Sequence, residues 1–150
     1  TGVDLWATAI AWAKEKAQET NLEIEFKVAN IDDLSVFAES SFDIIFDGNC
    51  LHCLSGTTRS SALLEIRRTL RAGGIFYVSS LTAAKLNSQF PGNFDLYSRI
   101  LYERQLPYRL ILEPDTLKRE LVSNGFKILS AITREESPFG HTFIHAQKTK

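Results

Sequence analysis

Residues 42–54 have the sequence FDIIFDGNCLHCL and residues 70–81 the sequence LRAGGIFYVSSL, and these two stretches decide the fold. Each joins a short run of β-branched and aromatic residues to a turn signal, either Asp-Gly after the run or Gly-Gly before it. The first stretch therefore predicts a buried strand over Phe42–Phe46. The second predicts a central strand over Ile75–Leu81.

Helical and strand patterns alternate on both sides of these stretches. Apolar residues at helical spacing predict helices over 7–20, over 58–72 with a stop at Gly73-Gly74, and from Pro114 to Asn124-Gly125 with Leu117, Leu121 and Val122 facing inward. Further strands are expected at 23–28, 126–132 and 142–147. Only a loop separates the last two, so they form an antiparallel hairpin, and the whole pattern predicts an α/β fold with a mainly parallel sheet.

Composition excludes several classes of protein. The chain has 150 residues, of which 44% are hydrophobic, which suits one domain with one core. A net charge of -1 favours neither nucleic acid nor an anionic membrane, and the longest apolar runs are far too short to cross a bilayer. Two cysteines are too few for a disulfide framework, so we expect a cytoplasmic protein.

Five motifs stand in a fixed order along the chain. They are GVDL at 2–5, VANIDDL at 28–34, the two stretches quoted above, and EPDTLKRELVSNGFKIL at 113–129. Together they resemble a class I methyltransferase from its second strand onward, over almost the whole chain. The resemblance implies a Rossmann-like fold, S-adenosylmethionine as cofactor, and methyl transfer to a small molecule.

In the resembled family a first strand and a glycine-rich loop precede these motifs. No such glycine-rich run occurs in residues 1–150, so we expect a partial domain that lacks both features and leaves two strand edges unpaired. Such a domain would bind the cofactor poorly by itself. The alternative is therefore a methyltransferase-like binding module without activity.

The resemblance assigns the adenosine part of the cofactor to four residues. An acidic side chain at a strand end can accept hydrogen bonds from both ribose hydroxyls, and Asp4 holds that place. A cap on the following helix is its alternative role. Leu5 is expected to lie against the adenine ring, while the Asn30 side chain and the Ile31 amide meet the edge of the adenine. Asp32 and Asp33 are expected to begin a short helix.

The loop after Phe46 is expected to border the methionine part of the cofactor. Asp47 can meet its charged amino group, and Gly48 lets the backbone approach closely, although Asp-Gly also suits a simple tight turn. Methyl transfer needs alignment of the acceptor and, for some acceptors, removal of a proton. His52 is the candidate base, with packing between helix and sheet as the alternative.

Two other chemistries compete at the same place. Cys50 and Cys53 have the spacing of a thiol redox pair, with ordinary buried cysteines as the alternative. Zinc is excluded because the adjacent His52 and Cys53 cannot easily both face one ion, so no metal is expected. His141 and His145 share one face of the last strand, which is usual for a solvated face.

Residues 82–112 match the motifs least and are expected to be an insertion on the substrate side. The segment carries five aromatic side chains that can line an apolar cavity or pack in a core: Phe90, Phe94, Tyr97, Tyr102 and Tyr108.

Overall fold

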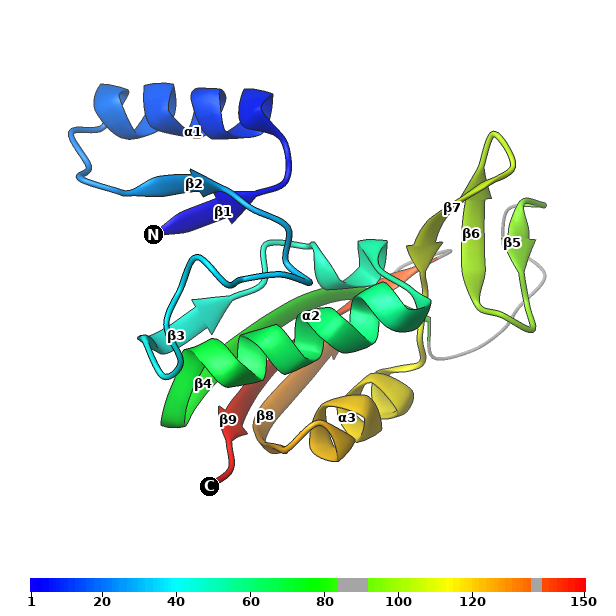
Figure 1. Ribbon diagram of the computed structural model, residues 1–150. Helices are drawn as coiled ribbons and strands as arrows, with labels where there is room; N and C mark the ends of the chain where they lie inside the picture. Colours follow the sequence, from blue (N-terminus) through cyan, green and yellow to red (C-terminus); the bar gives the residue numbers. More distant parts are fainter. Residues whose placement is uncertain (84–91, 136–138) are drawn as a thin grey trace.

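The structure is a computed structural model that describes residues 1–83, 92–135 and 139–150. The elements, shown in Figure 1, are β1 (Gly2–Asp4), α1 (Ala7–Glu19), β2 (Phe26–Val28), β3 (Phe42–Phe46), the 3-10 turn η1 (Leu51–Cys53), α2 (Gly56–Thr69), β4 (Leu70–Thr82), β5 (Phe94–Asp95), β6 (Ile100–Glu103), β7 (Leu106–Leu110), α3 (Pro114–Ser123), β8 (Phe126–Arg134) and β9 (Gly140–Lys148). Phe90 of the predicted aromatic set lies outside the described residues.

A four-stranded sheet forms the larger part of the molecule, in the order β3-β4-β9-β8. β3 and β4 run parallel, while β9 is antiparallel to both β4 and β8. The predicted α/β class and the predicted C-terminal hairpin are therefore confirmed.

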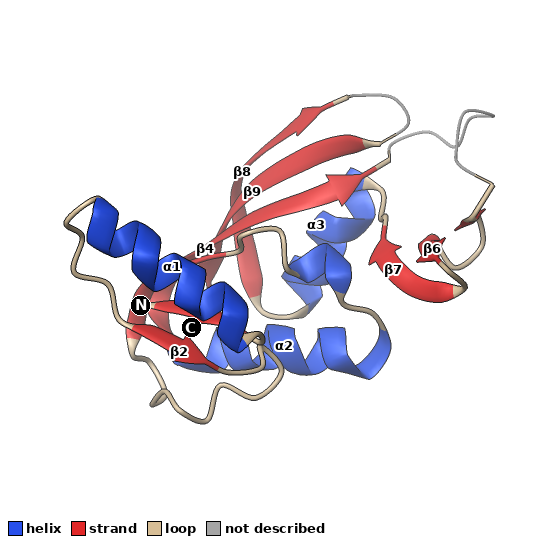
Figure 2. Ribbon diagram, turned by 90° about the horizontal axis from the view of Figure 1, so that it is seen from above, coloured by secondary structure: helices blue, strands red, loops and turns tan. Residues whose placement is uncertain are grey.

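Helices α2 and α3 pack on one face of this sheet, as Figure 2 shows. Leu63 of α2, Leu117 of α3 and Phe76 of β4 are at most 1% exposed and belong to one core cluster. Apolar residues at helical spacing on α2 and α3 and alternating residues on the strands supply this core, as their periods predict. Val122 is the exception on α3, because its side chain is 56% exposed rather than facing inward.

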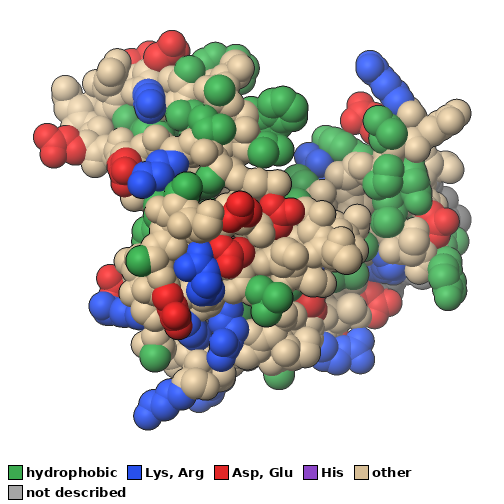
Figure 3. Space-filling view, viewed as in Figure 1, with side chains coloured by type: hydrophobic (Ala, Val, Ile, Leu, Met, Phe, Trp, Pro, Cys, Tyr) green, Lys and Arg blue, Asp and Glu red, His purple; other side chains and the backbone are tan. Residues whose placement is uncertain are grey.

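The first three elements form a separate unit. β1 pairs in parallel with β2, with Asp4 opposite Val28, and α1 connects them. Among the described strands, none joins β1 to β3, so each of these two strands keeps one free edge. Figure 3 shows hydrophobic side chains gathered on this unit. Two exposed apolar residues of the unit are Trp6 and Trp12.

The glycine pair Gly73-Gly74 does not end α2, contrary to the sequence prediction. α2 ends at Thr69, and Leu70 is already extended and paired with Phe42 of β3. The next regular pair is Ile44 with Ile75, so the glycines lie in an irregularity of β4. Gly73 has φ +76°, and a Cβ on Gly74 would stand 3.0 Å from the Asp43 carbonyl oxygen. The glycines therefore allow the backbone of β4 to approach β3 closely at this irregularity.

Strands β5, β6 and β7 form a three-stranded antiparallel sheet of their own, within the segment predicted to be an insertion. Its small core contains Ala83, Phe94 and Ile111. Figure 1 shows this sheet beside the main one, and β7 lies next to η1.

Candidate functional site

A cleft of about 790 Å³ lies between the β1–α1–β2 unit and the four-stranded sheet. Its walls come from the carboxyl ends of β1, β2 and β3 and from the turn that follows β3. Ligands of open α/β proteins bind at this edge, because the loops after parallel strands meet there. The cleft is lined by all six residues predicted to bind the cofactor, Asp4, Leu5, Asn30, Ile31, Asp47 and Gly48.

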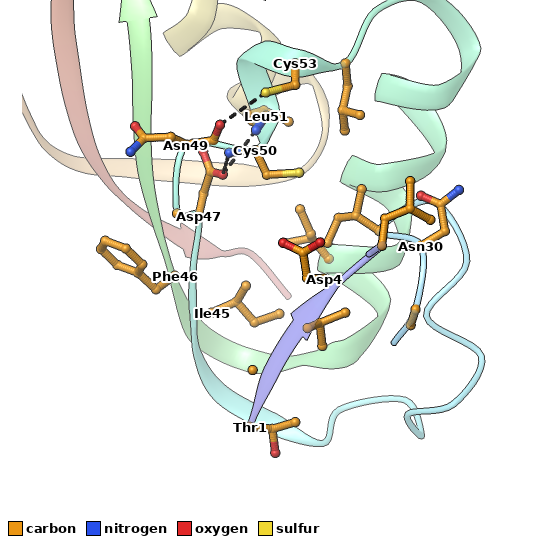
Figure 4. Close-up of a pocket in the computed structure, with 18 of the residues that line it drawn as sticks. Thr1, Asp4, Asn30, Ile45, Phe46, Asp47, Asn49, Cys50, Leu51 and Cys53 are labelled. Carbon is orange, nitrogen blue, oxygen red and sulfur yellow. Dashed lines mark hydrogen bonds between the residues drawn. The ribbon is translucent and has the colours of Figure 1, made fainter. Parts of the chain in front are cut away.

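Asp4 has a structural contact and a free oxygen. Its Oδ1 accepts a hydrogen bond of 2.8 Å from the backbone N–H of Trp6, just before α1 begins. Within the described residues, its Oδ2 makes no hydrogen bond. Figure 4 shows the carboxylate facing the turn after β3 across the cleft. The carboxylate thus supports the start of the helix and still offers an acceptor to a ligand.

Leu5, Asn30 and Ile31 complete the same wall. Leu5 is 54% exposed beside the cleft, which leaves its apolar surface open to a ligand. Asn30 begins a turn in which its carbonyl accepts from the Asp33 N–H at 3.0 Å. The helix expected at Asp32 and Asp33 does not form, because the described chain makes turns there and Asp33 accepts from Ser35 instead.

Asp47 lies on the opposite wall and is only 7% exposed. Its Oδ1 accepts from the N–H groups of Cys50 at 2.7 Å and Leu51 at 3.1 Å, which fixes the turn after β3. Its buried Oδ2 has no partner of normal geometry among the described residues, although the Ser79 N–H lies close enough to the carboxyl to lower its pKa. Burial raises the pKa of this carboxyl, and the backbone N–H groups oppose the rise.

Gly48 follows with open space over its Cα. A Cβ built there meets no atom within 4 Å, and its φ lies outside the left-handed region. Neither the backbone nor the packing of the described protein therefore requires glycine at this position. The open space faces the cleft, and a ligand can approach the backbone closely there.

His52 is not among the residues that line the cleft, although its neighbours Leu51 and Cys53 are. The residue is 3% exposed and its Nδ1 accepts a hydrogen bond of 3.3 Å from the Leu81 N–H. Burial, followed by the charges of Arg109, His141 and Arg59, lowers the pKa of His52 to about 4. The ring is therefore neutral at neutral pH, and these contacts support the packing role.

Cys50 and Cys53 line the cleft, and both thiols are free. Parts of both residues are exposed, so they are not the buried cysteines of the alternative interpretation. The sulfur of Cys50 lies in the cleft wall, where burial and the Asp47 carboxylate raise its pKa to about 11. Burial also raises the pKa of Cys53, whose Sγ donates to the Asn49 carbonyl at 3.3 Å. Protonated thiols are poor nucleophiles, which argues against a redox pair.

The sequence places Asn49 in the loop expected at the cofactor but assigns it no role, and the structure shows that it lines the cleft. It has φ 67°, a left-handed conformation that asparagine adopts more readily than most residues. An Asp-Gly-Asn run directly after a buried strand was the available signal.

The aromatic residues that the structure describes in the insertion do not line the cleft. Phe94 and Tyr102 border a separate hollow of about 600 Å³, Tyr97 is 99% exposed, and Tyr108 is 42% exposed. Within residues 1–83, 92–135 and 139–150, no group of three or more metal-binding side chains comes together. No helix in the same ranges is long and apolar enough to cross a membrane.

Comparison with protein families gives one match and comparison with curated proteins gives none. The family described as "Methyltransferase domain" matches residues 1–78, just over half of the chain. That range contains all six predicted cofactor residues and His52. No curated protein matches the sequence significantly.

Solved methyltransferases share the fold at low identity. A SAM-dependent methyltransferase from Methanosarcina mazei has a TM-score of 0.79 and 21% identity over 99% of this chain and 81% of its own. The 1,6-didemethyltoxoflavin-N1-methyltransferase of Burkholderia thailandensis has a TM-score of 0.73 and 21% identity over 99% of this chain and 60% of its own.

The cyclase SpnF is also similar, with a TM-score of 0.73 and 17% identity over 99% of this chain and 65% of its own. The chain thus spans less than two thirds of SpnF and of the Burkholderia enzyme. Fold similarity alone does not fix the reaction. The matched family and the shared fold together lead to one conclusion, that this chain belongs to the class I S-adenosylmethionine-dependent methyltransferases and has their Rossmann-like α/β fold.

Proposed function

We propose that the protein transfers a methyl group from S-adenosylmethionine to a small molecule, and that the cleft holds the cofactor. The observation that carries this proposal is the pair of carboxylates on opposite walls, each with an oxygen that lacks a partner of normal geometry among the described residues. The Oδ2 of Asp4 is open to ribose hydroxyls, and the Asp47 carboxylate places negative charge on the other wall for a cationic amino group.

The other lining residues fit the same cofactor. Leu5 offers an exposed apolar surface for the adenine ring, and Asn30 offers an amide for its polar edge. Gly48 leaves room for close approach beside Asp47. When bound, the cofactor supplies a methyl group on a positively charged sulfur, and the chain's own residues orient it and exclude water.

The acceptor side carries further proposals. A net charge of -1 suits a small molecule better than nucleic acid, and two free thiols suit the cytoplasm. His52 remains a prediction as the base for acceptors that lose a proton. A His52→Gln variant with unchanged methyl transfer would remove it from that role.

Calorimetry with S-adenosylhomocysteine and the full-length protein tests the cofactor site. Asp4→Asn keeps an oxygen that can accept from the Trp6 N–H but replaces the free oxygen with a donor, so affinity should fall by about tenfold while the thermal midpoint changes little. Asp95→Asn is the matched control, because Asp95 also accepts backbone N–H groups, from Tyr97 and Ser98, but lies outside the cleft.

Two results would contradict the proposal. A wild-type protein that binds neither S-adenosylmethionine nor S-adenosylhomocysteine would favour the inactive binding module. Equal affinity of wild type and Asp4→Asn would remove Asp4 from ribose recognition.

A further inference from the structure

Three polar side chains from distant parts of the chain meet beside the cleft. The Ser79 hydroxyl lies 2.9 Å from Oδ1 of Asn49 and 2.8 Å from Nε2 of His141. The same Nε2 lies 3.1 Å from Oδ1 of Asn49, so the three groups form a closed triangle. Asn49 lines the cleft, whereas the other two stand behind it.

The strand order explains why these residues meet. β9 runs antiparallel to β4, with Leu81 opposite His141 and Ser79 opposite Phe143. The first residues of β9 therefore lie at the carboxyl ends of β3 and β4, where the cleft opens. Ser79 and His141 are one diagonal step apart on the same face, and Asn49 reaches them from the turn after β3.

Asn49 needs support because its backbone is left-handed. Its φ is 67°, a conformation that asparagine tolerates better than most residues but that contacts with its side chain stabilise further. The hydrogen bonds from Ser79 and His141 hold its side chain, and the carbonyl of Asn49 accepts from Cys53. Gly48 and Cys50, its neighbours in the chain, also line the cleft.

We propose that His141 and Ser79 are positioning residues that clamp Asn49 and thereby fix the Gly48–Cys50 wall of the cleft. This inference rests on the proposed cofactor site. The clamp holds the wall opposite Asp4 in place before a ligand arrives, so less conformational freedom is lost on binding. His141, which the sequence assigned to a solvated strand face, would then determine cofactor affinity without touching the cofactor.

A double-mutant cycle tests whether His141 acts through Asn49. The measurement is the dissociation constant of S-adenosylhomocysteine by calorimetry, in full-length wild type, His141→Ala, Asn49→Gly and the double variant. His141→Ala should weaken binding about fivefold, the size of one lost hydrogen bond. In the Asn49→Gly background it should cause no further loss, because glycine has no side chain for the clamp to hold.

Three more variants separate the clamp from general damage to β9. His141→Gln keeps a donor near the position of Nε2 and should restore most of the affinity, and Ser79→Ala should resemble His141→Ala. His145→Ala is the matched control, since this ring lies on the same face of β9, packs against Tyr77 and should leave affinity unchanged.

The outcomes distinguish this inference from the proposed function. If wild type binds and His141→Ala binds equally well, or loses affinity equally in both backgrounds, the clamp is refuted while the cofactor site stands. If wild type does not bind, the proposed function fails first and the clamp fails with it. A His141→Ala protein that is unfolded by circular dichroism leaves Ser79→Ala and His141→Gln to decide by the same criteria.

Discussion

The two walls of the cleft are built in different ways. The wall after β3 stands on a sheet whose core includes Phe76, Leu117 and Ile144, each fully buried. The wall after β1 stands on the β1–α1–β2 unit, where Ile10 and Ala17 are the buried apolar residues of α1. Six large apolar side chains of that unit are at least 42% exposed, Leu5, Trp6, Trp12, Leu22, Ile24 and Val28.

Because of this difference, the residues predicted to bind the cofactor lie on two walls of unequal local stability. Local stability follows buried apolar contact, so the β1–α1–β2 unit should open at lower free energy than the sheet. Residues predicted to recognise adenine and ribose thus lie on the less stable wall, and Asp47 lies on the more stable one. Cofactor binding should therefore order the wall after β1 much more than the wall after β3.

The largest expected effect is the loss of stability when a buried side chain is truncated in the core under each wall. Phe76→Ala removes a fully buried ring and should cost about 3–5 kcal/mol of global stability. Ile10→Ala, at a 6% exposed position, should cost about 2 kcal/mol and act mainly on the β1–α1–β2 unit. Denaturant unfolding gives the first value, and hydrogen exchange of the separate elements locates the second.

Tryptophan fluorescence provides an independent signal for that comparison. The two tryptophans of the sequence, Trp6 and Trp12, both belong to the β1–α1–β2 unit and are 71% and 65% exposed. Ile10→Ala should shift the fluorescence transition to lower denaturant than the circular-dichroism transition. Coincident transitions in this variant would mean that the two walls unfold as one unit.

The second prediction concerns pH and applies to the sheet side alone. The pKa of His52 is about 4 in the folded protein against 6.5 for a free histidine, so the unfolded chain binds more protons between these values. Stability should rise as pH increases from 4 to 6.5, by at most about 3 kcal/mol, and the same amount is lost on acidification.

His52→Gln removes this titrating group and should flatten the stability profile between pH 4 and 6.5. His145→Ala is the comparison, because that residue is exposed and should leave the His52 contribution in place. A His52→Gln profile as steep as that of wild type would show that other groups cause the acid sensitivity.

The smallest effect is expected from removing a charge on β7 that acts on His52. Arg109 on β7 stacks on Tyr108 at 3.8 Å, and its charge is one cause of the lowered pKa of His52. Arg109→Ala should raise the pKa of His52 by less than about one pH unit, and NMR titration of the imidazole can measure it. Arg104→Ala serves as the control, since Arg104 is not among the charges that act on His52. An unchanged pKa would show that the charge of Arg109 does not act on His52.

Local signals were enough to predict the strand Phe42–Phe46, the ends of α3 and the terminal hairpin. The predicted burial of that strand was wrong, because Ile44 and Phe46 are 58% and 70% exposed on a strand with one free edge. The glycine pair at 73–74 was misassigned because it looks the same after a helix as within an irregular strand, and only the pairing of Phe42 with Leu70 decides between them. The strand expected from Glu23 begins only at Phe26, where pairing with Gly2 starts. Pairing partners are distant in sequence, so local patterns do not show them.

The same limit applies to the site. Asp4, Asn30 and Asp47 were assigned by the family resemblance, and all three line the cleft because each lies at or just after the end of a parallel strand. The contact of His141 with Asn49 spans 92 positions and depends on β9 lying against β4 in reverse direction. Nothing near either residue in the sequence indicates that contact.

The position of β9 between β4 and β8 also has a consequence for synthesis. The ribosome makes β9 after every element that it joins, so β4 and β8 must wait with open edges until Gly140–Lys148 emerges. Pairings this far apart in sequence close slowly. The order of translation therefore exposes β4 and β8 in the nascent chain. A pause before β9 is synthesised should make the nascent chain bind chaperones and aggregate more readily.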